Sequence, residues 1–529
     1  MVRVAILGAG ASGLTAIKCC LDEGLEPVCF EKTDDIGGLW LYRGDTNKFP
    51  ELGCVFKSTV INTSKEIMSF SDFPCPKEFA NFMHNRQVYQ YLKLYADKFG
   101  LMKHIQFNNS VTSAKKAADF DSTGRWDIEI KDEVTGDKKM ETFDALFVCN
   151  GHHAKPYIPD FPGIDDFQGT KLHTHYYRTP DSFKDKRVVV IGIGNSGGDA
   201  AVELSRWASQ VYLSTRRGTW VIHRISDFGI PVDILNVKRF LFLAPLWLQN
   251  AFFEFKLNLN VNHKLYGLLP KHKALSAHPM VNDDLPNRIA NGTVIIKPNI
   301  KRFTKNGVEF EDGTFEDNID VVIIGTGYEF GYPFLPKSVI KVEKNKVDLY
   351  KYVFPPDLEK PTLAVVGLVQ PWGAINPLSE LQCRWAARVF KGVTELPPKE
   401  KMHQDIKQKR ESMAKRYVAS QRHTIQVDFV EYCDDLAIEF GVKPDFQKML
   451  FSDPVLFFKS IFGTFLPYQY RLQGPGKWEG AREAIMTVWE RVEAPFLTRK
   501  VHTSSSYTKI IILILFGILL AAFFKRWFN

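Results

Sequence analysis

The chain opens with VRVAILGAGASG at residues 2–13, a short apolar run that leads into three glycines spaced G-x-G-x-x-G. The run predicts a buried strand over residues 2–7, and the stretch from Leu14 to Glu23 predicts a helix that ends at Gly24. Residues 27–30 predict the next strand. In such a unit the three glycines allow a tight turn, close approach of the backbone to a pyrophosphate, and close packing of the helix on the strand.

A carboxylate follows the second strand of this unit. Glu31 lies 23 residues after Gly8, where it can accept hydrogen bonds from ribose hydroxyls. The helix N-terminus would face the phosphates. The residues expected to surround them are Gly8, Ala9, Gly10, Ala11, Ser12 and Gly13. We therefore predict a dinucleotide site at this turn.

The same pattern returns at RVVVIGIGNSGGD, residues 187–199. It predicts a strand over 187–191, a helix from Ala200 to about Ala208 and a strand over 210–215. Arg216 and Arg217 stand after this strand, where the first unit has a carboxylate. Guanidinium groups suit a 2′-phosphate, so the second unit is predicted to prefer NADPH to NADH; the alternative is two solvated arginines in a loop. Two such sites imply FAD in one and NADPH in the other.

The predicted fold class is α/β, with two Rossmann-type dinucleotide-binding domains, a helical apolar insertion and a C-terminal membrane-anchoring helix. Each dinucleotide-binding domain is expected to be discontinuous in the sequence. The predicted order is an FAD-binding domain (1–155), an NADPH-binding domain (156–215), a membrane-associating insertion (216–295), the second part of the NADPH-binding domain (296–330), the second part of the FAD-binding domain (331–445), a C-terminal helical region (446–502), and a linker with the membrane anchor (503–529).

Two apolar segments point to a membrane. The stretch from Phe240 to Phe255 is rich in aromatic residues and leucine, with basic residues nearby, and the run from Ile510 to Phe524 follows a Thr/Ser-rich linker. Fifteen residues span ~22 Å as a helix, less than the ~30 Å hydrocarbon core. The tail therefore either crosses with its aromatic and basic flanks at the interfaces or lies in one leaflet. A buried core helix is the alternative.

Composition argues against several other classes. A net charge of +8, from 68 basic and 60 acidic residues, is weak grounds for a nucleic-acid surface. The eight cysteines form no C-x-x-C pair, so we expect no metal site and no disulfide framework, and we interpret the adjacent Cys19 and Cys20 as packed thiols. The chain enters a strand directly, without the pattern of a secretory signal, which favours the cytosolic side.

A further motif makes the resemblance to a family specific. F-x-G-x-x-x-H-x-x-x-Y-R, present as Phe167, Gly169, His173, Tyr177 and Arg178, is similar to the signature of the flavin-containing monooxygenases. EGLEPVCFEK, DDIGGLW, GPGKWEGAR and the apolar tail extend the resemblance over nearly the whole chain, to the vertebrate microsomal members.

The chain departs from the family pattern in three places. Asn150 stands where Ser or Thr is usual, Gly325 replaces an alanine, and the loop 42–55 differs. None of these departures removes a cofactor-binding group. They fit an unusual orthologue or a reconstructed sequence.

The resemblance implies roles for individual residues. It implies FAD contacts at the first glycine turn, at Glu31, and at Leu39, Trp40, Asn62 and Thr63. It implies NADPH contacts at the second turn and the two arginines, namely Gly192, Gly194, Asn195, Ser196, Gly197, Gly198, Asp199, Arg216 and Arg217. Asn62 matches the family's active-site asparagine, which positions the nicotinamide and the flavin peroxide formed when oxygen adds at C4a. A satisfied loop amide is the alternative.

The segment 274–289 resembles the fifth vertebrate isoform, with His278 where heteroatom-oxidising isoforms tend to have glutamate. This implies Baeyer–Villiger oxidation of small lipophilic ketones or aldehydes with O2, His278 being catalytic; alternatively, His278 packs near Asp283 and Asp284 in a surface turn. N- and S-oxygenation of amines and thioethers, or uncoupled NADPH oxidation with H2O2 release, are the alternative activities. A flavin disulfide reductase would need a redox-active cysteine pair, and a non-catalytic flavin-binding adaptor would not consume oxygen.

The expected partners are the substrate, O2 and membrane lipid. The oligomeric state stays open, a homo-oligomer included. The resemblance to the microsomal members implies the endoplasmic reticulum membrane, with the catalytic part facing the cytosol.

Overall fold

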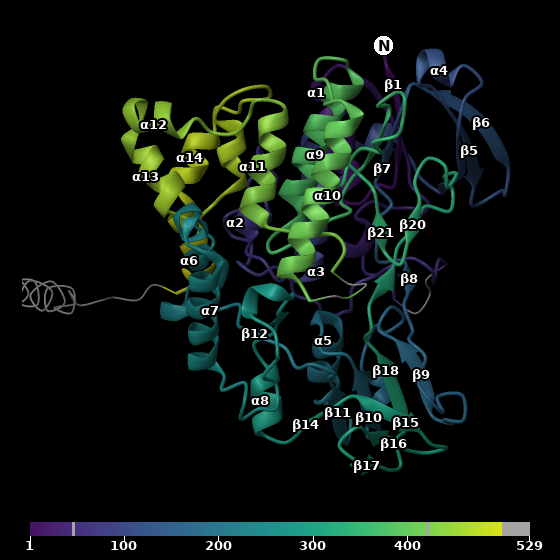
Figure 1. Cartoon of the computed structure of the whole chain (residues 1–529), viewed down its shortest axis with the longest axis vertical. Helices are drawn as coiled ribbons and strands as arrows, with labels where there is room; N and C mark the ends of the chain where they lie inside the picture. Colours follow the sequence, from purple (N-terminus) through teal and green to yellow (C-terminus); the bar gives the residue numbers. More distant parts are fainter. Residues whose placement is uncertain (45–47, 419, 421–422, 500–529) are drawn as a thin grey trace, which may run out of the picture.

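The computed structural model describes residues 1–44, 48–418, 420 and 423–499 (Figure 1). Two five-stranded parallel sheets lie at its centre. The first sheet collects strands from both halves of the chain. In spatial order its strands are β22 (Leu363–Val365), β7 (Ala145–Val148), β1 (Arg3–Leu7), β2 (Glu26–Phe30) and β3 (Ile105–Gln106).

The second sheet has the same kind of order and lies at the bottom of the view in Figure 1. Its strands are β14 (Val294–Lys297), β11 (Gln210–Ser214), β10 (Arg187–Ile191), β18 (Val321–Ile324) and β9 (Thr170–His173). The two glycine motifs follow the central strands β1 and β10. This α/β architecture agrees with the predicted fold class.

Two antiparallel sheets border the parallel ones. The larger consists of β4 (Asn109–Lys116), β5 (Trp126–Asp132) and β6 (Lys138–Phe143), and the smaller of β15 (Ile300–Phe303), β16 (Val308–Phe310) and β17 (Phe315–Glu316).

The helices after the two glycine turns begin earlier than predicted. Helix α1 is Ala11–Asp22 and helix α5 is Asn195–Leu204, so the expected start at Ala200 is wrong by five residues. The low helix propensity of glycine caused the error. Gly198 lies inside α5 because a Cβ there would stand 1.9 Å from Cε of Met280. Close packing therefore outweighs the propensity.

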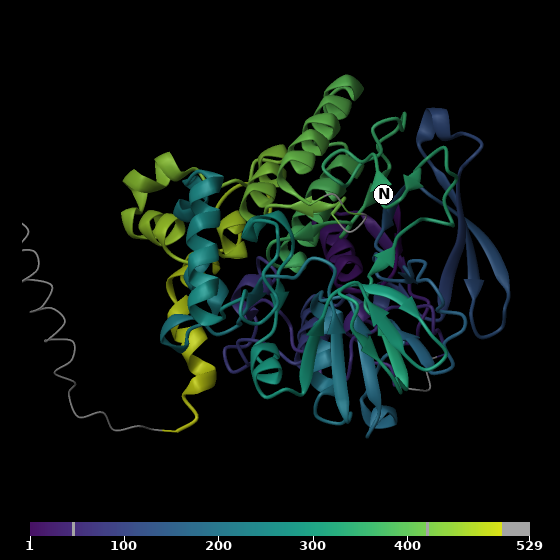
Figure 2. The same ribbon diagram turned by 60° about the horizontal axis from the view of Figure 1, so that its bottom comes forward.

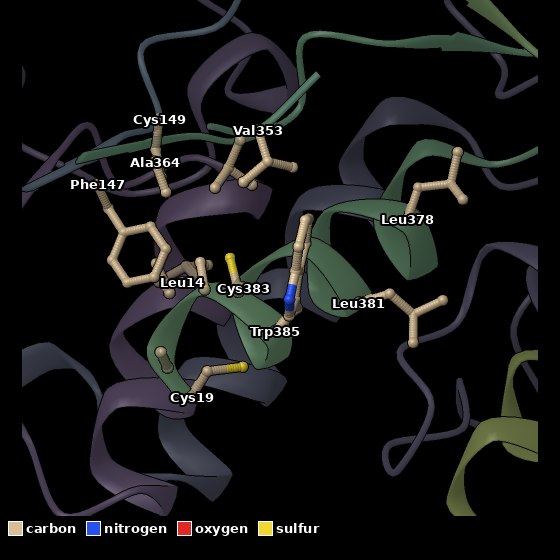
Figure 3. Packing of buried hydrophobic residues seen from close by; sticks show 14 of the residues in the cluster. Leu14, Cys19, Phe147, Cys149, Val353, Ala364, Leu378, Leu381, Cys383 and Trp385 are labelled. Carbon is tan, nitrogen blue, oxygen red and sulfur yellow. The ribbon is translucent and has the colours of Figure 1, made fainter. Parts of the chain in front are cut away.

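Helix α9 (Ile375–Phe390) packs against α1 and covers the first sheet (Figure 3). Trp385, Leu14 and Phe147 are fully buried in this core. All eight cysteines are free and buried. Burial raises the pKa of the Cys19 and Cys383 thiols well above the usual range, so these side chains stay protonated at neutral pH.

The insertion and the C-terminal helices lie on one side of the molecule (Figures 1 and 2), where the segment before α7 (Leu246–Asn260) contacts α13 (Pro454–Phe462), the helix that follows α12 (Phe446–Ser452). The insertion also contains α6 (Val232–Asn236), β12 (Val221–Ile222), β13 (Met280–Val281) and α8 (Leu285–Ala290). The remaining larger helices are α3 (Asn85–Lys98), α10 (Lys399–Arg416), α11 (Phe429–Glu439), α14 (Ala481–Met486) and α15 (Val488–Glu493).

None of the helices within the described residues is both long enough and apolar enough to cross a membrane. The predicted anchor at Ile510 to Phe524 lies outside the described residues.

Candidate functional site

The first glycine turn has the backbone that its motif predicts. Gly8 has φ +97°, and a Cβ on this residue would stand 2.9 Å from the carbonyl oxygen of Cys149. Its N–H donates to the carbonyl of Phe30, the last residue of β2, at 2.8 Å. A Cβ on Gly13 would lie 1.8 Å from the Gly8 carbonyl oxygen. Only glycine fits at either position, and the turn ends at the start of α1.

Side chains from two further segments close around this turn. Glu31 is buried, and its carboxylate accepts hydrogen bonds from the Ala9 N–H at 2.8 Å and the Thr33 N–H at 2.9 Å. The turn that carries Leu39 and Trp40 is anchored here as well, because the Gly37 N–H donates to the Ala9 carbonyl at 3.0 Å. Glu31 therefore supports the glycine turn in addition to its predicted place beside a ribose.

The second glycine turn repeats this geometry. Gly192 has φ +100°, and a Cβ there would stand 2.5 Å from the Gly325 carbonyl oxygen. Its N–H donates to the carbonyl of Ser214, the last residue of β11, at 2.9 Å. A Cβ on Gly197 would lie 2.0 Å from the Gly192 carbonyl oxygen. The two turns thus fit the same kind of ligand, a dinucleotide with its pyrophosphate at a helix N-terminus.

The insertion packs against the start of α5. Asn195 accepts from the Val281 N–H at 2.9 Å, and Asp199 accepts from the Asn282 side-chain amide at 2.8 Å. Burial raises the pKa of Asp199 to about 6, although the hydrogen bond from Asn282 opposes the rise. Asn195 and Asp199 therefore have protein partners, while Ser196 between them is exposed.

A cavity of about 760 Å³ lies over the second turn. Its walls include Gly192, Gly194, Thr215, Arg216, Arg217 and His278. Both arginines are exposed, and neither guanidinium pairs with an acidic residue in the described parts of the chain. Two unneutralised cations beside a dinucleotide turn suit a 2′-phosphate. The residues present therefore fit NADPH.

His278 reaches the same cavity from the insertion. Its Nε2 hydrogen-bonds Oε1 of Gln426, and its ring stacks on that of Trp372 with centroids 5.7 Å apart. Asp283 and Asp284 are paired instead with Arg224 and Arg206. Because the Gln426 amide donates to Gln370, its oxygen faces His278, and Nε2 of the imidazole carries the hydrogen.

Asn62 lies apart from this cavity, in a loop that the insertion holds. Arg224, which the sequence reading missed, donates to the Asn62 side-chain oxygen at 2.8 Å and to the Ile61 carbonyl at 3.1 Å. It also pairs with Asp283 at 2.9 Å. The available signal was a basic residue two positions after the short strand β12, but its partner is 162 positions away.

Residues of the F-x-G-x-x-x-H-x-x-x-Y-R motif connect the end of β9 to α5 and to the loop at Arg43. His173 ends β9, and the Tyr177 hydroxyl donates to Glu203 on α5 at 2.9 Å. Arg178 donates to the Arg43 carbonyl at 3.0 Å. Burial lowers the pKa of His173 to about 4, so its imidazole is neutral at physiological pH. These residues are structural in the described site. No group of three metal-ligating side chains occurs in the part of the chain that the structure covers.

Comparisons with known proteins agree with this geometry. A family model described as flavin-binding monooxygenase-like matches residues 1–527. Flavin-containing monooxygenase 5 from Oryctolagus cuniculus is 54% identical over 516 residues, which are 96% of each chain. The solved S-allyl-L-cysteine S-oxygenase from Allium sativum superposes with a TM-score of 0.65 at 26% identity, over 92% of this chain and 98% of that one. The OTEMO complex with FAD and NADP has a TM-score of 0.59 at 17% identity, over 83% and 98%.

Proposed function

Because this chain belongs to the flavin-binding monooxygenase-like family, we propose that it converts small lipophilic ketones and aldehydes to esters by Baeyer–Villiger oxidation. It is a flavin-containing monooxygenase with FAD and NADPH as cofactors. When bound, FAD reduced by NADPH would react with O2 and supply the oxygen atom that is transferred. The protein's own residues bind, orient and hold protons.

In this proposal each glycine turn binds one of the two cofactors. The turn at Gly8, with Glu31, binds FAD, and the turn at Gly192 binds NADPH. Arg216 and Arg217 bind the 2′-phosphate, because they provide positive charge on the wall of the same cavity. Asn62, whose side chain Arg224 holds by a hydrogen bond, orients the nicotinamide amide.

The position of His278 is the observation that carries the choice of substrate. Its imidazole lines the cavity of the second turn, and Nε2 carries a hydrogen toward Gln426. Addition to a carbonyl builds negative charge on the carbonyl oxygen. A carboxylate at the place of His278 would repel that charge, whereas an imidazole adds no negative charge there. Attack by sulfur or nitrogen builds no such charge on the substrate.

We expect His278→Glu to lower ketone oxygenation about tenfold relative to thioether oxygenation, equivalent to ~1.4 kcal/mol in the two barriers. His278→Gln adds no charge, so its ratio of ester to sulfoxide should lie between those of His278→Glu and the wild type. The measurement is the ratio of ester to sulfoxide formed from a long-chain ketone and a thioether, at equal flavin content and saturating NADPH.

His272→Glu serves as the matched control because it puts the same charge on another part of the cavity wall. Its product ratio should stay close to that of the wild type. An unchanged ratio in His278→Glu would contradict the assignment of His278.

The alternative activity is oxygenation of sulfur or nitrogen, which the likeness to the Allium sativum S-oxygenase favours. Uncoupled NADPH oxidation is the other alternative. The same assay separates them: sulfoxide without ester supports heteroatom oxygenation, and H2O2 equal to the NADPH consumed supports oxidase activity.

We also propose attachment to the endoplasmic reticulum membrane, with the catalytic part facing the cytosol. Exposed apolar side chains of the insertion support an attachment surface in addition to the tail: Leu243 is 83% exposed, Trp247 71% and Phe255 63%. On the adjoining α13, Phe462 packs against Phe240 with ring centroids 5.5 Å apart. Large exposed apolar areas favour an interface.

Removing the chain from Thr503 onward is expected to leave FAD content unchanged and to lower retention in the membrane fraction, with part of the protein still bound. Substituting Leu243, Trp247 and Phe255 with serine in the truncated chain should release that part. The measurement is the share of protein that sediments with membranes. A truncated protein that is fully soluble without detergent would exclude the second attachment surface.

A further inference from the structure

Asp233 is a buried carboxylate that the proposed chemistry does not use. It lies near the start of α6 in the insertion and is 8% exposed. One carboxylate oxygen accepts from the Ser64 N–H at 2.6 Å, across 169 positions of sequence, and the other accepts from the Ile234 N–H at 3.0 Å. No lysine, arginine or histidine among the described residues forms an ion pair with it.

A buried carboxylate without a cation costs free energy. Burial raises the pKa of Asp233 to about 6, and the hydrogen bonds from Ser64 lower it only in part. An apolar residue at this position would leave the Ser64 N–H without this acceptor. The buried Asp233 carboxylate therefore has one evident function, which is to accept the hydrogen bond of the Ser64 N–H.

Helix α6 is held by hydrogen bonds from Thr464 and Phe465, so the Asp233 carboxylate has a defined position. The Thr464 hydroxyl donates to the Ile234 carbonyl at 2.8 Å, and the Phe465 N–H donates to the Val237 carbonyl at 2.8 Å. The insertion thus presents Asp233 to the loop from a helix that is hydrogen-bonded at both of these carbonyls.

Two charged residues of the insertion, Arg224 and Asp233, hold opposite ends of one loop. Arg224 binds the carbonyls of Val60 and Ile61 and the side chain of Asn62, while Asp233 binds the N–H of Ser64. A guanidinium on carbonyl oxygens and a carboxylate on an N–H match the direction of the peptide dipoles. Asn62 and Thr63 lie between them.

We propose that Asp233 is a positioning residue, whose carboxylate fixes the Asn62–Ser64 loop so that the Asn62 amide faces bound NADP. This inference rests on the proposed role of Asn62. It makes the insertion, in addition to any contact with lipid, a part that aligns the cofactor site.

The test measures the dissociation constant of NADP+ for the oxidised, FAD-loaded protein, together with the H2O2 released per NADPH consumed. Asp233→Ala removes a charge-assisted hydrogen bond and should weaken NADP+ binding about three- to tenfold and raise H2O2 release. Asp233→Asn keeps an acceptor for the Ser64 N–H, so its NADP+ affinity and H2O2 release should be closer to those of the wild type. Asn62→Ala is the reference, and Asp233→Ala added to it should have little further effect.

Asp434→Asn is the matched control. Asp434 receives Arg239 of the insertion in a two-pronged ion pair at 2.8 and 2.9 Å, away from the Asn62 loop. This variant should lower the unfolding temperature without changing NADP+ affinity.

The outcomes separate the two hypotheses. Weaker NADP+ binding in both Asn62→Ala and Asp233→Ala, non-additive in the double variant, supports the proposal. If Asn62→Ala weakens binding and neither Asp233 variant does, the positioning role is overturned while the role of Asn62 stands. If Asn62→Ala has no effect, the assignment of Asn62 fails and the inference fails with it.

Discussion

Replacing Arg216 with glutamate is expected to lower kcat/KM for NADPH about 100-fold and to leave kcat/KM for NADH within about threefold of the wild type. The reason is that only NADPH has a 2′-phosphate, and a charge-assisted hydrogen bond contributes about 1.5–3 kcal/mol. Arg216 lies exposed on the wall of the cavity over the second glycine turn, where no described carboxylate neutralises it. The substituted carboxylate would also repel the phosphate.

The comparison needs a control with the same change of charge outside the cavity. Arg206 provides it, because it pairs with Asp284 at 2.6 Å and is not part of the cavity wall. Arg206→Glu should change kcat/KM only slightly, and by the same factor for NADPH and NADH. Steady-state kinetics with both cofactors, at several salt concentrations, measure the difference. Equal losses with NADPH and NADH in Arg216→Glu would refute the assignment.

The second large effect concerns a buried group of charges between α1, α9 and the segment at Arg471. Glu380 on α9 is fully buried and receives the Arg471 guanidinium at 2.6 Å, which also pairs with Asp72 at 2.8 Å. Lys18 on α1 completes the group through Asp72 at 2.5 Å. Burial alone would raise the pKa of Asp72, but the charges of Arg471 and Lys18 bring it below its ordinary value.

Arg471→Met is expected to destabilise the protein by about 3–5 kcal/mol, because it leaves buried Glu380 without a cation. The unfolding temperature of the FAD-loaded protein should fall by about 3–5 °C. The double variant Glu380→Gln/Arg471→Met should be more stable than Arg471→Met alone, since it also removes the buried charge that Arg471→Met leaves without a cation.

Arg482→Met is the control for this series. Arg482 pairs with Asp453 at 2.6 Å on the surface, where such a pair contributes less than about 1 kcal/mol. Thermal unfolding of these three variants and of Glu380→Gln alone measures the differences. A double variant as unstable as the sum of its single changes would show that the charges do not act together.

Sequence-based interpretation was accurate for both glycine turns because the relevant physics is local. A glycine with positive φ after an apolar strand, and a third glycine too close to a carbonyl for a Cβ, are properties of six consecutive residues. Gly8 and Gly192 show the same geometry for this reason. The interpretation failed at the start of α5, where contact with Met280, remote in sequence, compensates for the poor helix propensity of Gly198.

The amino-acid sequence by itself determined the α/β class, the two dinucleotide units and the family, because short strands, turns and motifs specify them. Only the tertiary structure decided which distant residues meet at the site. His278 meets Gln426 across 148 positions, Arg224 meets Asn62 across 162, and Asp233 meets Ser64 across 169. These hydrogen bonds depend on how the insertion packs against the loop 60–64 and against the segment around Gln426, and packing between remote segments leaves no periodic pattern in the chain.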